Sequence, residues 1–156
     1  MPYGTLRIAK PLCTSVRTTM NLTDKQISEI AELLDCGMTC FYHISTGEIE
    51  SHPDPNDGYF DPEPWQDLID KIENDWGNYE KFEKMDSNES YRVMERFANT
   101  LTDTKFKYKV MESISRRKPF QNFKRLIDSS DYRQKWFDFK NQSYIEYVKE
   151  QIELKK

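Results

Sequence analysis

The segment from Ser113 to Ile127 concentrates residue types that bind other molecules. Five of its residues are cationic: Arg116, Arg117, Lys118, Lys124 and Arg125. Such side chains hold carboxylates or phosphates, and the interspersed Phe120 and Phe123 could stack on nucleic-acid bases. The two phenylalanines, however, stand with Ile127 at helical spacing, which is typical of a buried stripe. We therefore expect core aromatic side chains beneath a basic surface.

Two kinds of partner suit this basic surface. An acidic protein is the first, because guanidinium groups pair with carboxylates in a fork geometry. Nucleic acid is the alternative, and it predicts an affinity that falls steeply with salt. The strongly acidic middle of the chain argues against broad affinity for polyanions.

Histidines and cysteines are few, with two and three respectively in 156 residues. Cys36, Cys40 and His43 do not form the two close ligand pairs that zinc fingers and ribbons need. In a strand, Cys40 and His43 would also point to opposite faces. We expect no metal site and no disulfide framework, and we expect His43 to lie on the surface, paired with Glu50.

Residues 53–64 form a proline- and acid-rich stretch that contains Asp54, Asp57 and Asp61. Carboxylates are ligands for Ca²⁺ and Mg²⁺, but the spacing is not that of an EF-hand, and we expect a solvated loop. A hydrolase that uses these acids is a further alternative, which requires carboxylates of raised pKa in a deep pocket. The chain has no glycine-rich phosphate motif, which argues against nucleotide hydrolysis and dinucleotide redox chemistry.

The net charge of −4 conceals a strong asymmetry. Residues 1–20 carry 3 basic residues and no acidic one, residues 21–104 carry 6 basic and 20 acidic residues, and residues 105–156 carry 14 basic and 7 acidic residues. Such a split can mark a segment that binds polyanions. We favour mutual neutralisation of the two halves within one folded unit, because the basic part is also highly aromatic.

The composition indicates one globular domain. Aromatic residues make up 13% of the chain and supply a core, although 32% of residues are charged and the mean hydropathy is −0.88. No apolar run is long enough to cross a bilayer, and residues 1–20 lack the apolar stretch of a secretory signal. With so few cysteines, we expect a cytoplasmic protein without membrane association.

The patterns predict a mostly helical α+β domain in residues 21–156. Residues 1–20 show no apolar period, and we interpret them as a disordered leader with Met20 as a candidate start. A capping box of Thr23 and Gln26 opens the first helix, and Gly37 ends it.

A β-hairpin follows in residues 38–44 and 48–52, turning at Thr46-Gly47. A two-residue turn would place Ile44 opposite Ile49 and would direct Cys40 and Tyr42 to the core. The hairpin is the small antiparallel sheet that we expect near the N-terminus.

Helices dominate the rest of the chain. They are predicted from Pro62 to Gly77, Ser87 to Leu101, Thr104 to Arg117, Pro119 to Ile127 and Asp131 to Ile152. The apolar face of the first of these helices comprises Trp65, Leu68, Ile69, Ile72 and Trp76. Residues 79–85 could add a short strand. We expect one aromatic cluster where the last two helices cross. Its members are Phe120, Phe123, Trp136 and Phe139.

Several motifs occur in a fixed order between residues 38 and 154. They are Thr46-Gly47-Glu48, the helix Tyr91–Phe97, the run Arg117–Lys124 and the Trp136–Phe139 box. In this order the chain resembles uncharacterised protein family 0158, a group of small bacterial proteins, although that pattern often has glycine where Arg116-Arg117 stand. The resemblance implies a compact cytoplasmic domain and brings no activity, cofactor or catalytic residue.

These observations lead to one functional hypothesis. We expect a small non-enzymatic binding or regulatory module, without a cofactor, that meets its partner through the basic C-terminal surface. The sequence leaves the identity of the partner and the oligomeric state open.

Overall fold

The computed structural model describes residues 20–156, and its first element is helix α1 (Asp24–Asp35). Thr23 and Gln26 form the predicted capping box, in which each side chain accepts the other residue's backbone N–H. Residues 1–19 of the expected leader lie outside the described residues. Met20 is buried against the core.

Three strands form an antiparallel sheet of order β3-β2-β4. They are β2 (Met38–His43), β3 (Ile49–Pro53) and β4 (Tyr79–Phe82). The short strand suggested for residues 79–85 is therefore present, and it pairs with β2 rather than extending the hairpin.

The predicted hairpin register is wrong by two residues, because Tyr42 rather than Ile44 stands opposite Ile49. Residues 44–47 form a wider loop than expected, which the His43 backbone N–H closes by donating to the Glu48 carbonyl. Since side chains alternate with a period of two, a shift by two residues leaves the faces unchanged. Tyr42 therefore points to the core as predicted.

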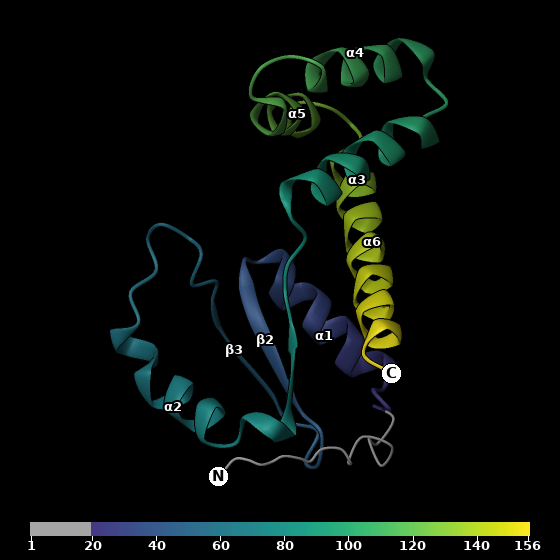
Figure 1. Ribbon diagram of the computed structural model, residues 1–156. Coiled ribbons are helices and arrows are strands. Elements are labelled where there is room, and N and C mark those ends of the chain that lie inside the picture. Colours follow the sequence, from purple (N-terminus) through teal and green to yellow (C-terminus); the bar gives the residue numbers. More distant parts are fainter. Residues whose placement is uncertain (1–19) are drawn as a thin grey trace.

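Helices lie against both faces of the sheet (Figure 1). Cys40 and Phe82 pack on one side with residues of α1 and α6 (Arg133–Leu154). Phe41 and Tyr79 pack on the other side with Ile72 of α2 (Gln66–Asn74). The strand β2 is consequently buried on both faces.

The helix expected between Pro62 and Gly77 is shorter than predicted. A 3₁₀ turn (Glu63–Trp65) precedes α2, and another (Trp76–Asn78) follows it. Within α2 only Ile72 is buried, and the Trp76 side chain is 54% exposed. Most of the predicted apolar face of this helix is therefore not buried, because the helix packs against only a small cluster on the sheet.

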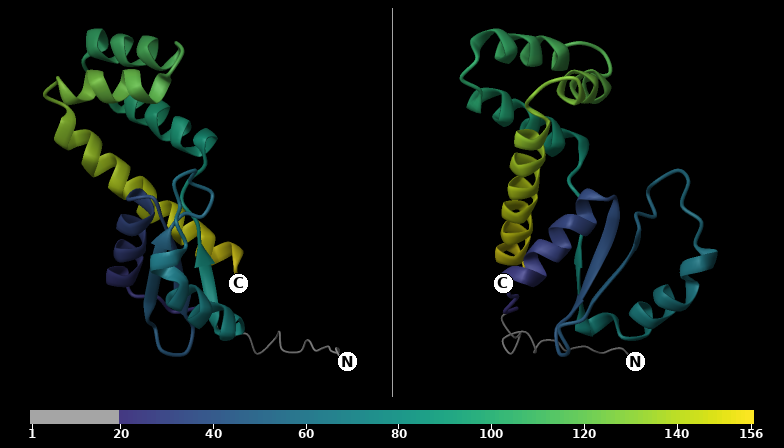
Figure 2. Two further views of the ribbon diagram at one scale, coloured as in Figure 1. Left: turned by 90° about the vertical axis from the view of Figure 1, so that its left-hand side faces the viewer. Right: turned by 180° about the vertical axis from the view of Figure 1, so that it is seen from behind.

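The second half of the chain forms a helical core. Helices α3 (Ser87–Thr100), α4 (Thr104–Ile114) and α5 (Pro119–Asp128) surround it, and α6 runs from it down to α1 (Figures 1 and 2). The fold class is therefore α+β and mostly helical, as expected. Among residues 20–156, no helix combines the length and apolarity that crossing a bilayer requires.

Candidate functional site

The five predicted cationic residues lie together on the turn between α4 and α5 and on α5 itself. All are exposed, and we call them the basic face: Arg116, Arg117, Lys118, Lys124 and Arg125. Two of them pair along their own helices, Arg116 with Glu112 at 3.0 Å and Lys124 with Asp128 at 2.8 Å. Within residues 20–156, no carboxylate oxygen lies within 4.0 Å of a side-chain nitrogen of Arg117, Lys118 or Arg125.

The turn that carries the basic face is tight and pinned. Lys118 has a φ of 57°, in the left-handed region that non-glycine residues seldom adopt. The Asn122 side-chain amide donates to the carbonyls of Ser113 at 3.0 Å and Arg117 at 2.8 Å. These bonds hold the turn without the glycine that the resemblance led us to expect, so the cations project from a fixed backbone.

The basic face lies at the opposite end of the molecule from the acidic helix α2 (Figure 1). In the described chain, two ion pairs join residues 105–156 to the acidic middle: Lys140 with Asp35 at 3.2 Å, and Lys155 with Glu80 at 3.9 Å. Both pairs involve α6 rather than the basic face. Mutual neutralisation of the halves is therefore only partial, and the positive charge of α4 and α5 faces solvent.

The aromatic residues form the predicted cluster, but its centre is Phe97 of α3. The Phe97 ring is 0% exposed, and its centroid lies 5.2 Å from that of Trp136 and 5.5 Å from that of Phe139. Phe123 is buried and lies 4.6 Å from Trp136. Phe123, Trp136 and Phe139 are thus core residues, although Trp136 and Phe139 are only half-buried.

Phe120 is the exception, because its side chain is 43% exposed. It shares a face of α5 with Phe123 but lies a turn nearer the start of the helix. There it borders an open groove that Ser90, Val93 and Met94 of α3 also line. The expectation that Phe120 belongs to the interior is therefore wrong.

This groove lies between α3, α5 and α6 and has a volume of about 310 Å³. We call it the aromatic groove, and the aromatic residues that line it are Phe120, Phe123, Trp136, Phe137 and Tyr144. Ion pairs of Lys124 with Asp128 and of Lys140 with Asp35 stand on its rim. Phe137 was not predicted as a site residue, although it lies within the Trp136–Phe139 box, because it stands beside the apolar stripe of α6 rather than on it.

The opposite side of α5 borders a second hollow of about 310 Å³. Lys109, Arg116 and Arg125 line it, together with Asn122 and Glu112. Helix α5 is therefore a ridge between an aromatic groove and a cationic cleft. The cationic cleft suits carboxylate oxygens, because two guanidinium groups offer several donors in one place.

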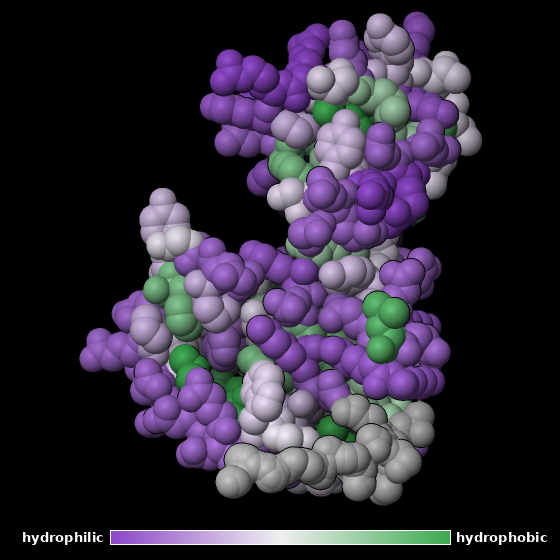
Figure 3. Space-filling view, in the orientation of Figure 1, coloured by the Kyte–Doolittle hydropathy of each residue, from purple (hydrophilic) through white to green (hydrophobic). Residues whose placement is uncertain are grey.

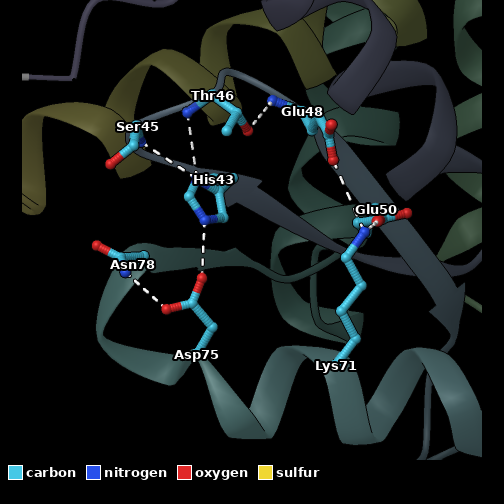
Figure 4. A network of polar contacts seen from close by, with 8 residues as sticks. All are labelled: His43, Ser45, Thr46, Glu48, Glu50, Lys71, Asp75 and Asn78. Carbon is cyan, nitrogen blue, oxygen red and sulfur yellow. Dashed lines mark hydrogen bonds and ion pairs between the residues drawn. The ribbon is translucent and has the colours of Figure 1, made fainter.

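The most suggestive catalytic geometry surrounds His43 (Figure 4). Its Nε2 lies 2.9 Å from the Asp75 Oδ2, and its Nδ1 faces the backbone N–H groups of Ser45 and Thr46, each at 3.2 Å. Because both N–H groups donate to Nδ1, the ring proton is on Nε2 and is donated to Asp75. Neither ring nitrogen is free to accept a substrate proton, and the Ser45 hydroxyl points away from the ring (Figure 4).

The His43 network therefore pins the hairpin loop to the end of α2. Hydrogen bonds from the Asn78 amide and from His43 hold the pKa of Asp75 below its ordinary value. The predicted pairing of His43 with Glu50 is wrong, since Glu50 pairs with Lys71 (Figure 4). No local sequence pattern could have indicated Asp75, which lies 32 residues from His43.

The acidic loop is solvated, as expected, and its carboxylates form hydrogen bonds with the backbone of the loop itself. Asp54, Asp57 and Asp61 each accept a backbone N–H two residues further along the chain. Asp57 and Asp61 are exposed, and Asp54 also pairs with Lys84. None of these three carboxylates lines the aromatic groove or the cationic cleft, which does not favour the hydrolase alternative. Residues 20–156 contain no group of three or more His, Cys, Asp or Glu residues that could hold a metal ion.

The comparisons with known proteins place the chain in a family without assigning it an activity. No curated protein and no solved structure matches it. A family model described as "Uncharacterised protein family (UPF0158)" matches residues 59–156, which include the basic face and the aromatic cluster. Since this match spans more than half of the 156 residues, the chain belongs to the UPF0158 family.

Proposed function

We propose that the protein is a non-enzymatic binding module whose basic face takes an acidic segment of a partner protein. The observation that carries this proposal is the group of Arg117, Lys118 and Arg125, which are exposed and lack an internal carboxylate partner among the described residues. Exposed cations that satisfy no internal contact remain available to an external one. A carboxylate-rich segment would complete their pairing.

The surroundings support a protein ligand. The cationic cleft beside α5 offers Arg125 for bidentate pairing, with Lys109 and the Glu112-paired Arg116 beside it, and it is large enough for carboxylate side chains. The molecule's charge asymmetry would orient such a partner during approach, because opposite charges steer association. The exposed free thiol of Cys36 supports a reducing, cytoplasmic setting.

A charge-reversal variant tests the proposal. The triple variant R117E/K118E/R125E should lose acidic proteins that the wild-type chain retains in a nuclease-treated pull-down, with the captured proteins identified by mass spectrometry. The matched control is K25E/K135E/K149E, which makes the same change in net charge at exposed lysines of α1 and α6. An identical set of captured proteins for the wild type and the triple variant would reject the proposal.

Nucleic acid is the second candidate, and the exposure of Phe120 favours it. An aromatic ring that is 43% exposed among Lys118 and Lys124 resembles the stacking platforms of single-strand binders. Gel shifts with a labelled random-sequence RNA test this candidate. It predicts a shift that F120A weakens and that salt abolishes, whereas an acidic-protein module gives no shift.

A further inference from the structure

Tyr59 is the most exposed of the large hydrophobic side chains that are recorded as exposed among residues 20–156. It is 97% exposed and lies in the loop between β3 and α2. Aromatic side chains are costly to leave in water and frequently anchor interfaces. At this exposure, the ring has almost no contact with the other described residues.

The loop presents Tyr59 on an ordered backbone. The Tyr59 backbone N–H donates to the Asp57 side chain at 3.2 Å, and the Phe60 N–H donates to the Asp57 carbonyl at 3.0 Å. At its base, the Asp54 N–H donates to the Gly37 carbonyl at 3.2 Å. An anchor held in this way binds with less loss of conformational entropy than one on a slack loop.

The aromatic groove has the complementary chemistry. Phe120 and Phe137 are both exposed at its edge, at 43% and 36%. Around Tyr59, residues 53–64 carry four acidic and two aromatic residues but no lysine or arginine. On the rim of the groove, Lys124 and Lys140 offer cations, each already facing one carboxylate, and Lys118 stands two residues before Phe120 without such a partner among the described residues.

The loop and α5 project on the same side of the molecule (Figures 1 and 2). Between the helical part and the loop, the outline of the molecule is indented (Figure 3). Two copies that face each other through this side could each insert a loop into the other's groove. A two-fold axis would make the two contacts identical and close the assembly at a dimer.

We propose that the protein forms a two-fold homodimer in which Tyr59 of each copy enters the aromatic groove of the other. In this dimer, the acidic loop of the partner copy, with Tyr59 at its tip, closes the open side of the aromatic groove. In this arrangement the acidic loop of each copy approaches the cations of α5 and α6 in the other copy. The charges therefore favour a contact of loop with groove over a contact of loop with loop. This inference does not depend on the acidic partner proposed above.

Sedimentation equilibrium of the full chain tests the dimer. Y59A should raise the dimer dissociation constant at least about 30-fold, the loss expected for an interface anchor, and F120A/F137A should do the same. The matched control is Y108A, which removes a tyrosine that is 69% exposed on α4, away from the groove lining. Thermal denaturation followed by circular dichroism verifies that each variant is folded.

Mixing the two defective variants gives the decisive result. A Y59A copy retains its groove and an F120A/F137A copy retains its loop, so the mixed dimer regains one complete contact. We expect the mixture to associate more tightly than either variant alone. A wild-type chain that stays monomeric, a dimer that Y59A leaves unchanged, or a mixture no tighter than its components would each overturn the proposal.

Discussion

Phe97 joins α3 to α5, which carries part of the basic face, and to α6, so its truncation measures how much that core supports the site. The side chain is fully buried and contacts the rings of Phe123, Trp136 and Phe139. Replacing a buried phenylalanine by alanine removes its transfer free energy and leaves a cavity. F97A should therefore lower the free energy of unfolding by about 3–5 kcal/mol.

F120A is the matched comparison, because it makes the same chemical change three residues before Phe123 on α5. The Phe120 side chain is 43% exposed, so only part of its surface is returned to water. We expect a loss of roughly 1 kcal/mol. The difference between the two variants thus tests the finding that the core is centred on α3 rather than on the start of α5.

Urea denaturation, followed by far-ultraviolet circular dichroism and by tryptophan fluorescence, gives both values. Where F97A is too unstable to purify, F97L supplies a milder change, with an expected loss of under about 1.5 kcal/mol. Equal losses for F97A and F120A, or a loss below about 1.5 kcal/mol for F97A, would contradict the range expected of a buried ring and refute the assignment.

Three further predictions concern individual residues. K118G should raise the free energy of unfolding by about 0.5–1 kcal/mol, because glycine adopts the left-handed backbone at φ 57° without strain. Urea denaturation measures this free energy, and an unchanged value would contradict the strain at Lys118. Because the pKa of Asp75 is lowered from 3.8 in the folded protein, its carboxylate stabilises the fold above about pH 3.8, and this stabilisation is lost as the pH falls further. D75N should therefore flatten the acid limb of a plot of unfolding free energy against pH, which urea denaturation at a series of pH values measures. Burial raises the pKa of the Cys40 thiol to about 12, so iodoacetamide at pH 8 should modify Cys36 and spare Cys40 until the protein is denatured, as peptide mapping would show.

Local patterns predicted much of the fold because they depend on neighbours within one or two turns. The capping box at Thr23 is confirmed, and so are the helices expected from Ser87 to Leu101 and from Asp131 to Ile152, which are α3 and α6. Periodicity, however, states which face of a helix is apolar and not how far the neighbouring helices extend. Phe120 shows the difference, since it lies on the predicted face of α5 but borders the open aromatic groove and is 43% exposed.

The remaining errors come from contacts between distant residues. The hairpin register depends on the loop that His43 and Asp75 hold in place, and these residues come from separate elements. The candidate surface was predicted well for its cations, whose clustering is local in the sequence. The aromatic groove was not predicted, because α5, α6 and Asp35 at the end of α1 meet only in the folded chain.

The extent of the family match separates the two proposals. The basic face and the helical core beneath it lie entirely within residues 59–156. The dimer needs residues before this segment, because Gly37 anchors the loop and Asp35 lines the groove. Strand β4 also lies in the matched segment, whereas β2, the strand it pairs with, precedes it. Binding through the basic face therefore needs only residues that the family model covers. The contact between loop and groove also needs residues of the α1–β3 region. Disrupting the hairpin should consequently impair self-association before it impairs partner binding.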